Sequence, residues 1–243
     1  MKMFRFRWTT GALVSIAIVA AAGTRASGQG VRIVAPSSTA GVEADDSISP
    51  SPEPNKIQML FPASDFAGLP ASKRLLVAFN FRGDQTQTQA VDWNFPDEEF
   101  WISTTDKTSA TLSTVFADNH GPEKTLVHDG SYVFRILGSG PPQGPRDFAD
   151  GMRFQRPFYY DPSKGNLLIE QINYGGSMPN ISPTIDVRST QEFTLLGGDF
   201  NPNGTTGTLF TGLPVMLFEF VPEPSTVVLA GLALVSLFAW RRN

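Results

Sequence analysis

The chain has 243 residues and a mass of 26.4 kDa, which allows one large domain or two small ones. It contains no cysteine, so disulfides, thiolate metal sites, iron–sulfur clusters and cysteine nucleophiles are excluded. The formal net charge of −4 argues against a nucleic-acid partner. With 22 glycines and 19 prolines, the composition favours many turns and few long helices.

The N-terminal segment has the pattern of a secretory signal peptide over residues 1–28. Lys2, Arg5 and Arg7 precede an apolar run at 11–23. Small residues predict cleavage by signal peptidase between Gly28 and Gln29, and a cut after Ala26 is the alternative. An uncleaved membrane anchor is the other interpretation, although the run is shorter than the ~20 residues of a membrane span.

A second apolar run, at 226–240, lies near the C-terminus and is followed by Arg241 and Arg242. An apolar helix with a basic end is typical of a membrane span whose C-terminus stays in the cytoplasm. The sequence therefore predicts a short C-terminal transmembrane helix. Val221, Pro222, Glu223 and Pro224 stand before it, and the two prolines predict an extended, protease-accessible segment.

This combination resembles the PEP-CTERM sorting signal of Gram-negative bacteria that produce exopolysaccharide. Pro222, Glu223 and Pro224 match the triplet, and Arg241 and Arg242 match the basic end. The resemblance covers residues 222–243 and implies that an exosortase, a membrane protease-transpeptidase, recognises the chain. It also implies export through the inner membrane, anchoring, and delivery to the cell surface or extracellular space. An ordinary C-terminal anchor is the alternative.

The region between the two ends is acidic and begins with a Ser/Pro-rich segment. Residues 29–224 hold 13 of the 19 basic residues and all 23 acidic ones, a net charge of −10. Because residues 29–55 bury little apolar area, we expect a flexible linker there, including the second Pro-Glu-Pro triplet at 52–54.

Residues 56–221 show the alternating apolar pattern of β-strands. The predicted strands are 75–81, 100–103, 112–116, 131–136, 152–160, 166–173, 184–188, 192–196 and 214–221, the last buried on both faces. Asp129-Gly130 predicts a two-residue hairpin turn. We expect an all-β fold, an antiparallel β-sandwich of jelly-roll type, with two small β domains as the alternative.

One loop has the opening of a calcium-binding loop. Asp199, Asn201, Asn203 and Gly204 follow its spacing, but Phe210 occupies the twelfth position, where a bidentate Glu is needed. A plain turn is therefore the stronger interpretation, and a structural calcium elsewhere in the acidic body stays open. We predict no other cofactor.

Histidines and tryptophans are the two other residue classes with a possible role in chemistry or binding. His120 and His128 lie beside turns without a nucleophile-elbow pattern, so we expect polar turn residues and no catalytic residue. Trp93 and Trp101 are candidates for stacking on sugar rings, with core packing as the alternative.

Together these patterns predict an exported, non-enzymatic protein of the cell surface or extracellular matrix. We expect it to associate with exopolysaccharide in a biofilm. The alternative is a secreted carbohydrate-active enzyme on a jelly-roll scaffold, and nothing in the spacing selects a catalytic carboxylate pair.

Overall fold

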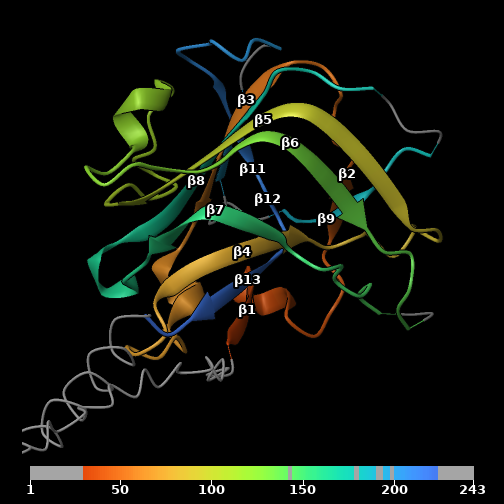
Figure 1. Cartoon of the computed structure of the whole chain (residues 1–243), viewed down its shortest axis with the longest axis horizontal. Coiled ribbons are helices and arrows are strands. Elements are labelled where there is room, and N and C mark those ends of the chain that lie inside the picture. The colour runs from red at the N-terminus through yellow and green to blue at the C-terminus, as the bar shows by residue number, and fades with distance from the viewer. Residues whose placement is uncertain (1–29, 142–143, 178–180, 190–193, 198–199, 224–243) are drawn as a thin grey trace, which may run out of the picture.

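The computed structural model describes residues 30–141, 144–177, 181–189, 194–197 and 200–223. Over these residues the fold is all-β, as predicted, with antiparallel strands and four short 3-10 helices. The two larger sheets form two layers, which Figure 1 shows one above the other. The predicted jelly-roll subtype stays a prediction.

The first layer is a four-stranded sheet in the order β1-β13-β4-β7. Its strands are β1 (Val31–Ala35), β13 (Met216–Val221), β4 (Leu75–Phe81) and β7 (Met152–Tyr159). Met216, Phe218 and Phe220 of β13 are fully buried, whereas on the other face Leu217 is buried and Glu219 and Val221 are half-buried, so the predicted burial on both faces holds only in part.

The second layer is a six-stranded sheet in the order β11-β10-β3-β8-β5-β6. It comprises β11 (Thr208–Thr211), β10 (Thr194–Gly197), β3 (Asn55–Phe61), β8 (Asn166–Asn173), β5 (Val91–Thr105) and β6 (Thr125–Ile136). Strand β8 occupies the predicted residues, because its turn-forming neighbours define both ends. A third, small sheet contains β12 (Leu213–Pro214), β9 (Ile185–Arg188) and β2 (Asp46–Ile48).

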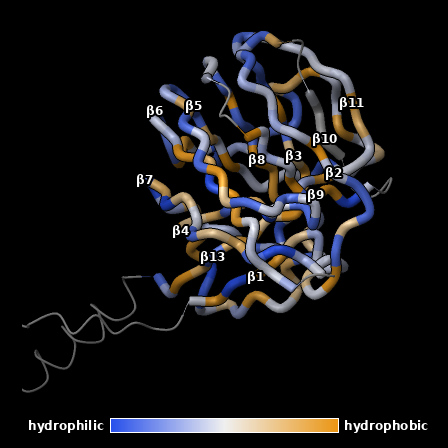
Figure 2. Tube along the Cα trace, turned by 90° about the vertical axis from the view of Figure 1, so that its right-hand side faces the viewer, coloured by the Kyte–Doolittle hydropathy of each residue, from blue (hydrophilic) through white to orange (hydrophobic). Residues whose placement is uncertain are grey.

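One hydrophobic core joins the two layers. Phe61 of β3 meets Phe218 of β13 edge to face, with ring centroids 5.1 Å apart, and Phe100 of β5 meets Phe79 of β4 in the same way. Edge-to-face aromatic pairs stabilise a core beyond the area that they bury. The hydropathy-coloured trace of Figure 2 shows hydrophobic stretches along the strands of both layers.

The prediction of a flexible linker over 29–55 is wrong for much of this segment. Strand β1 pairs with β13 over its whole length, and β2 pairs with β9. A 3-10 helix, η1 (Ser37–Thr39), follows β1 and buries Thr39. The composition of residues 29–55 predicted this segment wrongly, because a short strand needs few apolar residues of its own when it pairs with an apolar strand such as β13.

Two local predictions are also corrected. Asp129 and Gly130 lie inside β6, where Gly130 has φ +116° beside a register shift between β5 and β6, so the glycine serves a strand irregularity and not a turn. The predicted strand at 112–116 is a loop that leads into the 3-10 helix η3 (Phe116–Asn119). Leu112 and Phe116 nevertheless lie together, in a small apolar cluster with Leu60 and Leu168.

The predicted signal peptide at 1–28, its cleavage site at Gly28 and Gln29, and the predicted C-terminal helix lie outside the described residues. Among the residues that are described, no helix has the length and apolarity needed to cross a membrane.

Candidate functional site

The end of β13 carries the first residues of the predicted sorting segment. Phe220 is fully buried and stacks on Tyr160, with ring centroids 6.5 Å apart. Val221, Pro222 and Glu223 follow it and are half-buried. The segment therefore begins at the point where the core ends, and β13 fixes its direction of departure.

The start of the described chain lies beside this point. Val31 of β1 is the register partner of Phe220, because the two strands run antiparallel. Gly30 lies so close that a Cβ there would be 3.0 Å from the carbonyl oxygen of Phe220. The chain thus enters and leaves the fold at the same end of the β1–β13 pair.

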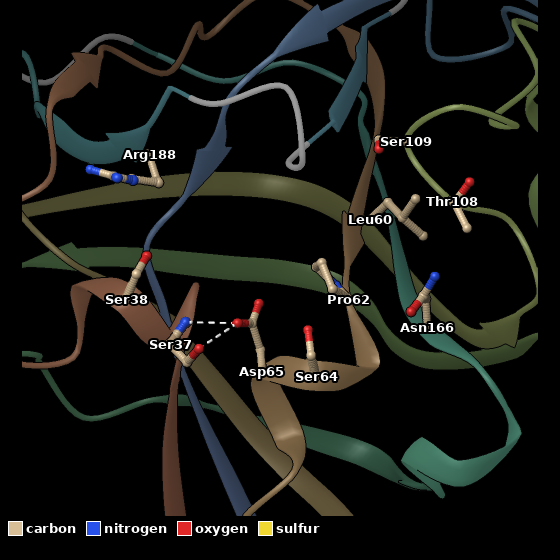
Figure 3. A pocket seen from close by; sticks show the side chains of 10 residues that line it. All are labelled: Ser37, Ser38, Leu60, Pro62, Ser64, Asp65, Thr108, Ser109, Asn166 and Arg188. Carbon is tan, nitrogen blue, oxygen red and sulfur yellow. Dashed lines mark hydrogen bonds between the residues drawn. The ribbon is translucent and has the colours of Figure 1, made fainter.

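A polar pocket of about 590 Å³ opens on another part of the body. Figure 3 shows the side chains that line it, which carry mainly hydroxyl, carboxylate, amide and guanidinium groups: Ser37, Ser38, Ser64, Asp65, Thr108, Ser109, Asn166 and Arg188, with Leu60 and Pro62. They come from η1, from the end of β3 and the 3-10 helix η2 (Ala63–Phe66) that follows it, from residues 108–109, from the start of β8 and from the end of β9.

Asp65 organises one wall of this pocket. Its Oδ1 accepts hydrogen bonds from the backbone N–H of Ser37 at 2.9 Å and from the Ser37 hydroxyl at 2.7 Å. Its Oδ2 is buried and accepts no hydrogen bond from the described residues. The opposite wall is fixed by Asn166, which accepts from the N–H of Ala63 and donates to the carbonyl of Lys107. These hydrogen bonds hold the side chains that line the pocket in place.

A buried polar network lies beneath the loop that joins β5 to β6. The imidazole of His120 contacts the Ser103 hydroxyl through Nδ1 at 2.9 Å and the Glu170 carboxylate through Nε2 at 3.3 Å. Lys124 lies 2.6 Å from the other oxygen of Glu170. Burial alone would raise the pKa of Glu170, but hydrogen bonds from His120 and Lys124 outweigh it and lower the pKa to about 2.

This network has the residue types of a Ser-His-acid triad, but its burial gives it a structural role. Ser103 is fully buried, and its Oγ also accepts from the N–H of Gly121 at 3.3 Å. A nucleophile must reach its substrate. The network instead fixes the loop onto the sheet, with Asn119 and Gln58 hydrogen-bonded side by side. The network could not be predicted from the sequence, because its hydrogen-bonded pairs are separated by 17 to 112 positions.

The comparison with family models identifies the C-terminal segment. Residues 220–243 match the model described as the PEP-CTERM protein-sorting motif. The chain carries a PEP-CTERM sorting signal. This motif is recognised by an exosortase and indicates export and sorting to the cell surface. No curated protein and no solved structure matches the chain.

The PEP-CTERM match confirms the resemblance seen in the sequence and places its first residues at the end of β13. Phe220, Val221, Pro222 and Glu223 belong to the described part of the motif. Pro224, Arg241 and Arg242 lie outside the described residues.

Of the two tryptophans predicted to contact glycans, Trp93 is buried. It is 1% exposed and its indole N–H donates to the carbonyl of Ser177, so the prediction is wrong for this residue. Its neighbours on the strand are apolar and buried on the same face, a pattern that equally indicates core. Trp101 lies half-buried on the opposite face, where the Lys124 ammonium is 4.8 Å from its ring centroid.

The predicted calcium loop lies only partly within the described residues. Asn201 accepts through Oδ1 from the N–H of Asn203 and through its carbonyl from the N–H of Gly204, a turn of ordinary Asn/Gly type. Asp199 is outside the described residues. Calcium binding at Asp199, Asn201 and Asn203 stays a prediction.

Proposed function

We propose that this protein is exported and processed by an exosortase near Pro222–Pro224, and that its β-rich body then contacts extracellular polysaccharide without enzymatic turnover. The sorting motif at 220–243 is the observation that carries the proposal. Until cleavage, the apolar run at 226–240 anchors the chain in the membrane, while signal peptidase removes the N-terminal segment.

The position of the motif suits processing of a folded substrate. Strand β13 ends at Val221, so the next residues have left the sheet. Pro222 has no N–H to donate to a sheet and holds an extended backbone, which is the form that proteases bind. Cleavage after Val221 leaves β13 and its pairing with β1 and β4 intact.

Replacing Pro222, Glu223 and Pro224 with alanine tests the sorting step. The expected result is accumulation of a longer, membrane-bound form in cells that contain the exosortase, detected by immunoblotting of fractions. The control is alanine at Pro52, Glu53 and Pro54, the second triplet, whose fold contacts use the backbone carbonyls of Pro52 and Glu53. Normal processing of the first variant would overturn the sorting proposal.

The polar pocket supports the glycan-contacting role. Its hydroxyl, carboxylate and amide groups offer both donors and acceptors, as sugar hydroxyls require, and Leu60 and Pro62 add apolar surface. The net charge of −10 over residues 29–224 favours neutral over acidic polymers, because like charges repel.

Retention on purified neutral exopolysaccharide measures this role. Ser64 is exposed at the pocket, so Ser64→Arg should block it without unfolding the protein and reduce retention about tenfold. Ser131→Arg, at an exposed residue of β6 that does not line the pocket, is the control. Equal retention of both variants would remove the pocket from the proposal, and release of reducing ends would favour the carbohydrate-active enzyme.

A further inference from the structure

Three acidic side chains from separate segments meet beside β9. Glu43 lies between β1 and β2, Asp84 follows β4, and Asp186 belongs to β9. One carboxylate oxygen from each lies within 4.8 Å of the other two. Asp186 is fully buried, Asp84 is 7% exposed and Glu43 is half-buried. The cluster therefore lies at the edge of the core, with Glu43 toward solvent.

Hydrogen bonds hold two of these carboxylates in place. Glu43 accepts from the backbone N–H of Gln85 through Oε1 at 2.8 Å. Asp84 accepts through Oδ1 from the N–H of Thr86 at 2.8 Å and from the Thr86 hydroxyl. Each of these contacts uses one oxygen of the carboxylate, so the group is oriented before any ligand arrives.

Arg82 balances only one of the three negative charges. Its Nε lies 2.5 Å from Asp186 Oδ2, and its Nη1 and Nη2 donate to the carbonyls of Thr39 and Val42. The guanidinium is thus committed to one carboxylate and to the backbone of the segment after β1. When all three carboxyls are ionised, the group carries two uncompensated negative charges.

Two oxygens of the cluster find no donor among the described residues. They are Asp186 Oδ1 and Glu43 Oε2, and both are buried. One carboxylate oxygen of Asp186 lies within 4.8 Å of one of Glu43. Because two carboxylate oxygens are both acceptors, such a contact needs either a shared proton or a cation.

We propose that Glu43, Asp84 and Asp186 bind a calcium ion that ties the segment between β1 and β2 to the core. The donors are all oxygen, as calcium requires, and a divalent ion cancels the two remaining charges. Glu43, the half-buried member, provides the route of entry and leaves room for water ligands. This site is separate from the Asn/Gly turn at 200–204.

Chelator-treated full-length protein in detergent provides the test, with thermal unfolding followed as calcium chloride is added. With the millimolar affinity typical of extracellular sites, about 10 mM calcium should raise the midpoint by about 4 °C. Sodium chloride at equal ionic strength controls for screening, and calorimetric titration with calcium chloride measures the stoichiometry.

Glu43→Gln keeps the oxygen that accepts from Gln85 and removes the charge, so this variant should lose the calcium-dependent shift. Glu53→Gln makes the same change at an exposed residue between β2 and β3 and should keep the shift. No midpoint shift in the unmodified protein would mean that the carboxyls share a proton, and the proposal would fail. A shift that survives in Glu43→Gln would also overturn it and would direct attention to the turn at 200–204.

Discussion

Two buried glutamates on neighbouring strands of one sheet have pKa values that are shifted in opposite directions. Glu170 of β8 lies on the outer face beneath the β5–β6 loop, and its pKa is lowered to about 2. Glu98 of β5 is fully buried, and its pKa is raised to about 8, chiefly by burial and then by the charge of Asp97 against one hydrogen bond from Gln171. Residue type and depth are alike, so the partners make the difference.

The partners differ in number and charge. Glu170 receives hydrogen bonds from Gln58 and Lys124 and a contact from His120, so every oxygen is satisfied. Glu98 has an oxygen, Oε1, with no partner among the described residues, as does the hydroxyl of nearby Tyr132, whose own pKa is raised by burial and by Glu98. A buried carboxylate stabilises a fold only when cations and donors compensate its lost hydration.

The largest expected effect on stability comes from removing the charge of Glu170, which its partners compensate. Glu170→Gln should lower the free energy of unfolding by about 3 kcal/mol at neutral pH, because it removes the buried carboxylate whose ionised form is stabilised by contacts with the Lys124 ammonium and the His120 ring. Chemical denaturation measures the change. Since the folded pKa is depressed, the unmodified protein should lose the same stabilisation as the pH falls from about 4.5 to about 2.

Glu123→Gln is the matched control, because Glu123 lies on the β5–β6 loop above Glu170, is exposed, and as glutamine can still accept from the N–H of Thr104. It should change stability by less than about 0.5 kcal/mol. Equal losses in the two variants would show that the Glu170 network does not fix the loop to the sheet.

Removing the Glu98 carboxylate should instead raise the free energy of unfolding. Because the pKa of Glu98 is raised in the folded protein, the folded state keeps the proton at pH values between about 4.5 and about 8, where the unfolded state releases it. Stability should therefore fall as the pH rises from about 4.5 to about 8. Glu98→Gln should make that decline shallower and raise the free energy of unfolding by about 2 kcal/mol at the alkaline end, as measured by denaturation across the pH series.

Glu99→Gln tests whether the fall in stability with pH depends on burial of the glutamate or only on its charge. Glu99 is the next residue, but it is half-buried on the outer face and bonded to Trp101 and Tyr174. It should retain the pH-dependent decline. If the decline is as steep in Glu98→Gln as in the unmodified protein, another buried acid must cause it.

The strand pattern was readable from the sequence where polar or turn-forming residues bound a short, mainly apolar run. Residues 75–81 and 166–173 are such runs, and both form strands within those bounds. Strand β1 was missed because its five residues gain their burial from β13, some 185 positions later. The pattern of one segment contains no information about such a partner.

The sorting motif was also readable, because its triplet, apolar run and basic end are contiguous. The acidic cluster and the Glu170 network could not be predicted, since their members come from distant segments that only the fold brings together. The role of Trp93 was predicted wrongly for a related reason. Aromatic residues form both hydrophobic cores and sugar-binding surfaces, and only the burial seen in the fold distinguishes the two.

The smallest expected effect comes from an ion pair that water already solvates. Arg135 donates to both oxygens of Asp92 across β5 and β6 at 2.6 Å, which lowers the pKa of Asp92. Both side chains are about half exposed, at 49% and 48%. Exposed pairs contribute little in salt, so Asp92→Asn should leave the denaturation midpoint unchanged at physiological ionic strength. A loss comparable to that of Glu170→Gln would mean that bidentate geometry, rather than burial, decides the value of a charge in this sheet.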